Sequence, residues 1–232
     1  MKTSRTSVAR HFSLQGILAL LALLLSAAGA PALADIPGYP SSVSAYDSRE
    51  VAMLPRFCIH TQLFRDAVPG GNNPAEIRKL QSVMGETFQA IHHYCWAMMK
   101  TNRALILARS QKDRQFYLSD SIGEFDYVIQ RAPADFVLLP EILTKKGENL
   151  LRLGRVVEAV GELRRAIEIK PDYWPPSIVL SDHYKATGEI AKAREILTAA
   201  LGYSPASKSV KERLAALNAA KGKRIVTPAP QP

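Results

Sequence analysis

The stretch from Pro140 to Ser207 decides the fold, because it contains one pattern twice: LGRVVEAVGELRRAIEIKP at residues 153–171 and TGEIAKAREILTAALGYSP at residues 187–205. The two copies align without a gap. Five positions carry the same residue 34 places apart: Gly154 and Gly188, Ala159 and Ala193, Leu163 and Leu197, Ala166 and Ala200, Pro171 and Pro205. Self-similarity at a fixed period of this length predicts a stacked repeat architecture.

A helical repeat of this period resembles the tetratricopeptide repeat family, whose helix–turn–helix units stack into a superhelix. In the first copy, at about residues 140–173, Gly147 and Ala159 let the paired helices approach and Gly154 turns the chain. In the second copy, at about residues 174–207, Ser181 replaces the small glycine. The resemblance implies an all-α fold, an α–α superhelix of helical hairpins, without a catalytic site or a cofactor.

A third, degenerate repeat is predicted before these two, within an N-terminal helical region at residues 74–139. Three residues precede their counterparts by 38 positions, the family period plus four: Phe125 before Leu163, Val128 before Ala166, and Pro133 before Pro171. Ser121 occupies the place of the family's small alanine. This offset predicts that the first helix of the degenerate repeat lies within residues 102–116.

The region before the repeats is predicted to contain the longest helix of the chain. Asn73 is suited to cap it and Pro74 to open its first turn, whereas Gly85 interrupts it as a candidate kink. Seven apolar residues at steps of three and four form one stripe facing a core: Ile77, Leu80, Met84, Phe88, Ile91, Cys95 and Met98. We expect an arm and short helices at residues 35–73, a capping helix at 208–221 and a disordered tail at 222–232.

The first 34 residues have the pattern of a secretory signal. A basic start with Lys2, Arg5 and Arg10 precedes an apolar run at residues 17–28, and Ala32 and Ala34 form an Ala-x-Ala cleavage site. We expect cleavage after Ala34 and a periplasmic or secreted protein; a retained membrane anchor is the alternative. No later segment is apolar enough to span a bilayer. The formal charge of +9 includes the three signal cations, and no dense Lys/Arg face predicts nucleic-acid binding.

Two cysteines, Cys58 and Cys95, are the only ones in the chain. In an oxidising compartment an isolated pair favours one disulfide. A metal site is the alternative, because Cys58, His60, His92 and Cys95 together offer two thiolates and two imidazoles, which would suit tetrahedral zinc. Catalysis by a thiol is less favoured, because Cys95 lies on the apolar stripe.

In the tetratricopeptide repeat family the first helix of each repeat lines the concave face, so the resemblance implies a groove that binds another protein or a peptide. The expected groove residues carry both charges with aliphatic residues between them: Arg103, Arg114, Glu141, Thr144, Glu148, Arg152, Ile178, Asp182 and Lys185. The family's basic clamp for a terminal carboxylate is not reproduced. Ordinary solvated positions are the alternative interpretation.

These observations favour an exported, non-catalytic adaptor or scaffold in the periplasm or cell envelope. Two other functions remain open from the sequence. One is a structural subunit of an envelope assembly, with possible homo-oligomerisation. The other is a metal-binding protein that uses the Cys/His residues.

Overall fold

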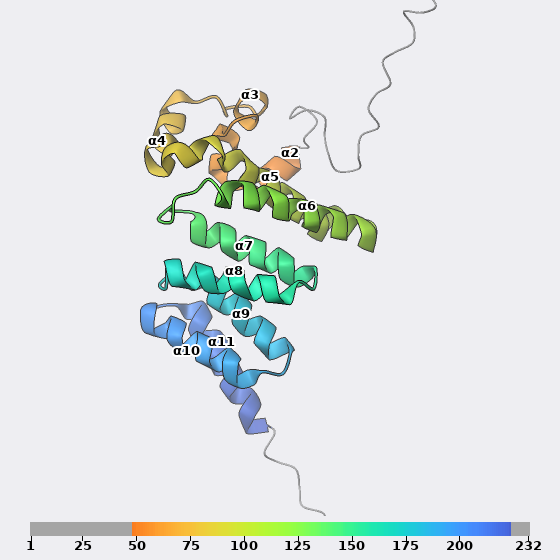
Figure 1. Cartoon of the computed structure of the whole chain (residues 1–232), viewed down its shortest axis with the longest axis vertical. Helices are drawn as coiled ribbons and strands as arrows, with labels where there is room; N and C mark the ends of the chain where they lie inside the picture. The colour runs from red at the N-terminus through yellow and green to blue at the C-terminus, as the bar shows by residue number, and fades with distance from the viewer. Residues whose placement is uncertain (1–47, 224–232) are drawn as a thin grey trace, which may run out of the picture. The chain divides into compact units, whose positions relative to one another are not determined.

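The computed structural model describes residues 48–223, which form helices joined by short turns (Figure 1). The predicted signal segment (1–34), the arm up to residue 47 and the tail from residue 224 lie outside these described residues. Among the described helices, none has the length and apolar character that a membrane span requires. The all-α architecture predicted from the repeats is confirmed.

The C-terminal half is a stack of two antiparallel hairpins and one further helix (Figure 1). The first hairpin pairs α7 (Leu139–Arg152) with α8 (Val156–Ile169), and the second pairs α9 (Pro175–Ala186) with α10 (Ile190–Tyr203). The last helix, α11 (Lys208–Lys223), packs on α10 and occupies the range predicted for a capping helix.

The same turn closes both hairpins. Gly154 and Gly188 have φ values of 77° and 83°, in the left-handed region that glycine adopts without a steric penalty. In each turn the N–H that follows the glycine bonds the carbonyl five residues earlier, at 2.9 Å from Arg155 and 2.7 Å from Glu189. This 6→1 bond is typical of helices that end on glycine. The turn therefore repeats with the sequence period.

Small residues set the distance between the paired helices. A Cβ added to Gly147 in α7 would lie 2.7 Å from Cγ of Leu163 in α8, which is too close for two carbon atoms. Ala159 and Ala193 are fully buried, and Ser181 is buried as well. The role predicted for Gly147 in close helix packing is confirmed.

The N-terminal half contains shorter elements around a second core. Their order is α2 (Ser48–Ala52), the 3-10 helix η2 (Arg56–His60), α3 (Phe64–Ala67), α4 (Pro74–Met84), the 3-10 helix η3 (Gly85–Gln89), α5 (Ile91–Asn102), the π-helical turn η4 (Arg103–Leu107) and α6 (Gln111–Ile129). The hairpin of α5 and α6 packs on α7 and so continues the stack of the repeats.

The long helix predicted from residue 74 is wrong, because the chain leaves the α-helix at Gly85. Asn73 caps α4 as expected, its side chain accepting from the backbone N–H groups of Ala75 and Glu76. Gly85 then has φ 57°, which ends α4, and the chain continues through η3 before α5. The longest described helix is α6, with 19 residues. The seven stripe residues nevertheless contribute to one core, because η3 redirects the chain without removing Phe88 from it.

The hairpin predicted as a degenerate repeat consists of α5 with η4 as its first helix and α6 as its second. Phe125 and Val128 are fully buried in α6, as the 38-residue offset predicts. The range 102–116 predicted for the first helix is wrong, since it contains the end of α5, η4 and the beginning of α6. The physical reason is length: α6 has 19 residues where α8 has 14, so its hairpin turn comes earlier in the chain.

Two long-range links fix the N-terminal elements on α5 and η4. Cys58 of η2 and Cys95 of α5 form a disulfide with an S–S distance of 2.09 Å, which is the pairing that the sequence favoured. Arg103 of η4 and Glu50 of α2 form a buried ion pair, with 2.5 Å between Nε and Oε1. These links join segments that lack any sequence repeat.

Candidate functional site

A cleft of about 500 Å³ lies between the first helices of successive hairpins. Three of the residues that line the cleft come from α7, four from α9 and one from α11. The capping helix α11 therefore contributes to the cleft as the first helix of a further repeat would. The lining residues are Glu148, Leu151, Arg152, Ile178, Val179, Asp182, His183 and Arg213. This cleft lies where the repeat resemblance implies a binding groove.

The cleft combines an apolar part with paired charges. Ile178 is buried, and Leu151 and Val179 are partly buried. At the edge, Nε of Arg213 lies 3.2 Å from Oδ2 of Asp182, which joins α11 to α9. Within α7, Glu148 is paired with Arg152 at 3.5 Å and with Lys145 at 3.3 Å. A ligand therefore meets aliphatic surface between groups of both charges.

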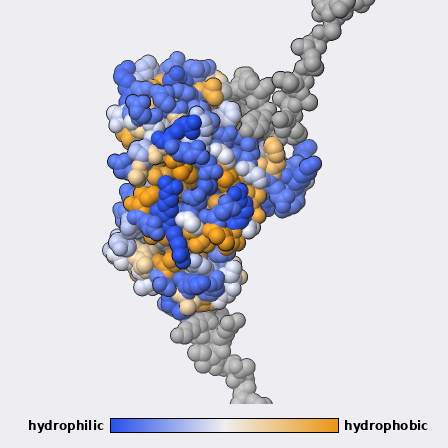
Figure 2. All heavy atoms as spheres, viewed as in Figure 1, coloured by the Kyte–Doolittle hydropathy of each residue, from blue (hydrophilic) through white to orange (hydrophobic). Residues whose placement is uncertain are grey.

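On the face of the molecule drawn in Figure 2, a similar mixture is visible. Apolar patches alternate with strongly hydrophilic side chains over the middle of the stack, around α7 to α9. Apolar and hydrophilic side chains are therefore close neighbours on the described surface in that view. Such surfaces suit protein segments that themselves combine apolar and charged residues.

Four of the nine predicted groove residues line the cleft: Glu148, Arg152, Ile178 and Asp182. Lys185 is exposed near the end of α9 but does not line it. The sequence interpretation missed Val179, His183 and Arg213. Arg213 follows Val179 by one period of 34 residues, but Val179 was not a predicted groove position, so the offset pointed to neither residue.

Thr144 and Glu141 are not open groove residues. Thr144 is 1% exposed, and its hydroxyl donates to the carbonyl of Pro140 at 2.6 Å within α7. Glu141 accepts a hydrogen bond of 2.7 Å from the hydroxyl of Tyr94 in α5. The prediction is wrong for Thr144 because a fixed offset along the sequence does not show that this side chain is buried. Glu141 instead joins two neighbouring first helices.

Arg103 and Arg114 were also misplaced by the fixed offset. Arg103 is buried in its ion pair with Glu50 and therefore presents no charge to a ligand. Arg114 is exposed, but it lies on α6, the second helix of its hairpin. The error for Arg114 follows from the longer α6, which shifts the first helix of the hairpin to α5, whereas the error for Arg103 follows from its pairing with Glu50.

Two carboxylates of α7, Glu141 and Glu148, act on nearby phenol groups. Tyr173, in the turn between α8 and α9, has a pKa raised to about 12 by burial and by the nearby charges of Glu141 and Glu148. Burial, followed by the charge and hydrogen bond of Glu141, raises the pKa of Tyr94 as well. Both phenols therefore stay neutral at physiological pH, and Tyr94 serves as a hydrogen-bond donor.

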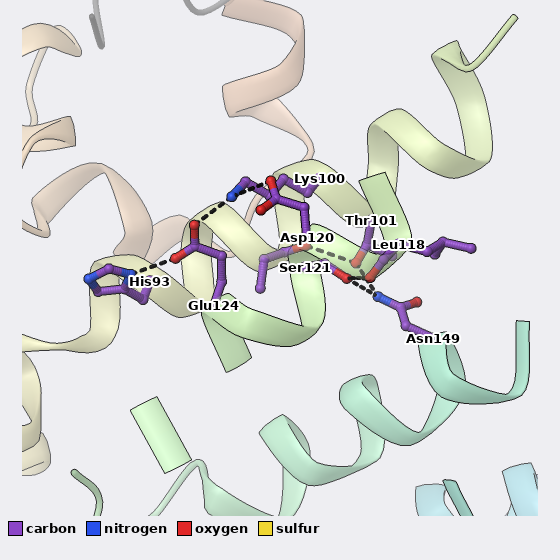
Figure 3. Close-up of polar contacts among 9 residues, drawn as sticks. His93, Lys100, Thr101, Leu118, Asp120, Ser121, Glu124 and Asn149 are labelled. Carbon is purple, nitrogen blue, oxygen red and sulfur yellow. Dashed lines mark hydrogen bonds and ion pairs between the residues drawn. The ribbon is translucent and has the colours of Figure 1, made fainter. Parts of the chain in front are cut away.

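A second polar cluster joins α5 to α6 (Figure 3). Glu124 lies 2.5 Å from Nδ1 of His93 and 2.5 Å from Nζ of Lys100, which also contacts Asp120 at 2.6 Å. Burial alone would raise the pKa of Glu124, but hydrogen bonds from His93 and Lys100 lower it overall. Each carboxylate already has a cationic or donor partner, so the cluster holds two helices together.

The cluster extends to α7 through Asn149, which is fully buried (Figure 3). Its Nδ2 donates to the hydroxyls of Thr101 at 2.6 Å and Ser121 at 2.9 Å. Both hydroxyls donate in turn to backbone carbonyls of their own helices. Ser121, which stands where the family's alanine is expected, thus supplies a polar contact between the degenerate repeat and α7.

Three of the four residues of the alternative metal site, Cys58, Cys95 and His60, are engaged otherwise. Both sulfur atoms are consumed by the disulfide, so the thiolate ligands are not available. His60 donates from Nδ1 to the carbonyl of Gly71 at 2.7 Å. Within residues 48–223 no three potential His, Cys, Asp or Glu ligands are arranged to hold a metal ion. The geometry therefore does not support this alternative.

Comparison with known proteins agrees with the repeat architecture. The tetratricopeptide repeat family matches residues 150–220, which run from the end of α7 into α11. No curated protein matches the chain. The family match supports the assignment of the C-terminal half to tetratricopeptide repeats, and it includes every cleft residue except Glu148.

Proposed function

We propose that this tetratricopeptide repeat chain is an exported, non-catalytic adaptor that holds a segment of another protein in the cleft of α7, α9 and α11. Tetratricopeptide repeats are generally protein-interaction modules, and this analogy gives the class of function. The observation that carries the proposal is that four of the predicted groove residues, from two different helices, line one cleft.

The lining of the cleft defines the kind of segment that it fits. Leu151, Ile178 and Val179 offer apolar contacts, which favour aliphatic or aromatic anchors. Asp182 and Arg213 present opposite charges at the edge, so a partner with both charges satisfies them better than a strongly anionic one. An amphipathic helix with apolar residues three and four places apart matches this arrangement.

Site-specific photo-crosslinking in cells tests the adaptor function. A photoreactive amino acid at Val179 lies in the cleft, whereas the same group at Val157, which is 87% exposed on α8, is the matched control. We expect a discrete adduct with a different protein from Val179 and none from Val157. Adducts with copies of this chain only would favour a structural subunit of an assembly and overturn the adaptor function.

Reversing the charge of Glu148 tests whether the crosslinked partner is bound in the cleft. Glu148→Lys places a cation beside Lys145 and Arg152, and we expect the Val179 adduct to fall at least about fivefold while the fold is retained. Glu158→Lys, on α8 and outside the cleft, is the control and leaves the adduct unchanged. Equal adduct yields from both variants would contradict a role for this cleft.

Export is tested separately from binding. The basic start, the apolar run and Ala34 support cleavage before Asp35 and release into the periplasm or medium. Mass spectrometry of the chain purified from its own cells should give a first residue of Asp35 in the periplasmic or secreted fraction. An intact Met1 in the cytosolic fraction would refute export without affecting the cleft.

A further inference from the structure

The turn between α5 and α6 presents an apolar tip, defined as residues 105–107. Leu105, Ile106 and Leu107 are consecutive and are 45%, 62% and 51% exposed. They are distant in sequence from the cleft residues, and their exposure is independent of the function proposed above. We propose that this tip docks the protein on an anionic lipid surface by inserting its three aliphatic side chains.

The tip is held in place by the structure beneath it. The three residues belong to the π-helical turn η4, which the N–H of Ala108 closes on the carbonyl of Arg103 at 2.8 Å. Arg103 is fixed by its buried ion pair with Glu50, and Ala104 is buried. The aliphatic side chains therefore face solvent from a defined turn, and no ordering of a free loop opposes insertion.

The position of the tip makes it accessible to a flat surface. In Figure 1 the hairpin of α5 and α6 extends past the ends of α7 and α8 on the side where η4 joins its two helices. A protruding turn reaches a bilayer without a collision with the neighbouring hairpin.

The charges beside the tip complement anionic headgroups. Arg109, Lys112 and Arg114 are all exposed, and Asp113 is the only acid between residues 105 and 117. Three cations and one acid leave a net charge of +2 next to the aliphatic residues. Clustered basic residues near an apolar element are attracted to anionic membrane surfaces.

The size of the tip favours a lipid surface over a protein partner. A stable protein interface buries roughly 800 Å² on each partner, which three half-exposed aliphatic side chains do not supply. Shallow insertion into the headgroup region needs only a small apolar area when basic residues add electrostatic attraction. The combination predicts weak, reversible binding that falls with increasing salt.

Vesicle flotation tests the proposal with the chain from Asp35 onward, which contains every described residue and lacks the apolar run at 17–28. We expect binding to vesicles of phosphatidylglycerol and phosphatidylcholine, and at least tenfold weaker binding to pure phosphatidylcholine. Ile106→Asp should reduce binding to the anionic vesicles at least tenfold. Val157→Asp, which makes the matching change at an exposed apolar residue of α8, should leave binding to the anionic vesicles unchanged.

Two further measurements keep the outcome decisive. Ile106→Ser should reduce binding with an unchanged circular dichroism melt, which separates the lipid contact from misfolding. Absence of binding to anionic vesicles, or full binding by Ile106→Asp, would overturn the proposal. Dimerisation of the parent that Ile106→Asp abolishes, without vesicle binding, would show that a second copy covers the tip and would overturn it equally.

Discussion

The two halves of the described chain are stabilised by different kinds of contact. In the C-terminal half, small and aliphatic residues such as Gly147 and Leu163 meet between paired helices, and the same turn recurs after one period. In the N-terminal half, a disulfide spans 37 residues and the ion pair of Glu50 with Arg103 spans 53. Periodic packing needs only neighbours in the sequence, whereas the N-terminal half depends on a few specific long-range pairs.

The largest effect is expected where a charge enters the periodic packing. Ala159→Arg places a guanidinium at a fully buried position between α7 and α8, and should lower the free energy of unfolding by about 3–5 kcal/mol. Urea denaturation followed by circular dichroism measures this. Val157→Arg, at a position that is 87% exposed in the same helix, is the control and should change stability by less than about 0.5 kcal/mol. Equal denaturation curves for both variants would contradict the repeat packing.

Removal of the disulfide tests whether the N-terminal half depends on its long-range links. Cys58→Ser combined with Cys95→Ser should lower the free energy of unfolding by about 3–4 kcal/mol, as expected for a loop of this length. Hydrogen exchange should increase in α4 and α5 while α9 and α10 stay protected. A reducing agent should reproduce the effect in the parent and leave the double variant unchanged. Uniform loss of protection across α9 and α10 would show that the two halves are not distinct.

A smaller effect is expected at the polar contact between the halves. Asn149→Ala removes the donors to Thr101 and Ser121 but leaves both hydroxyls bonded to backbone carbonyls, so the loss should be about 1–2 kcal/mol. The matched control is Asn218→Ala, because Asn218 is exposed on α11, where its side-chain oxygen accepts a hydrogen bond from Arg194. Chemical denaturation of the two variants gives the difference. Equal stabilities would mean that Asn149 does not couple α7 to the degenerate repeat.

The smallest effect on stability is expected from a change of pH, and it arises from His92 in the N-terminal half. Burial, followed by the charge of His93, lowers the pKa of His92 from 6.5 to about 4. The unfolded chain therefore binds a proton that the folded chain excludes, and stability falls as pH decreases from about 6.5 to 4. Partial solvent exposure of the ring limits this contribution to about 1 kcal/mol. His92→Gln should flatten the pH dependence of the urea midpoint in this window. An unchanged pH dependence would refute the role of His92.

The sequence interpretation succeeded wherever its argument rested on the period. Gly154 and Gly188 marked the turns, and Phe125 and Val128 identified a buried helix in the degenerate repeat. It failed at Gly85, where a single residue without a side chain ended the helix although the apolar stripe continues on both sides of it. It also failed for Arg103, because a period says nothing about a partner 53 residues away.

The sequence by itself determined the helical hairpins of the C-terminal half and predicted a groove beside them, because both arguments rest on residues that recur every 34 positions. Only the tertiary structure decided which charges remain available in that groove. Arg103 is neutralised by Glu50, and Arg213 reaches Asp182 from the capping helix. The hydroxyl of Thr144 donates to a carbonyl of its own helix. The physical reason is range. The packing of paired helices is set by the volumes of side chains that are close in the sequence. Whether a polar group is paired or available depends instead on which distant residue the tertiary structure places beside it.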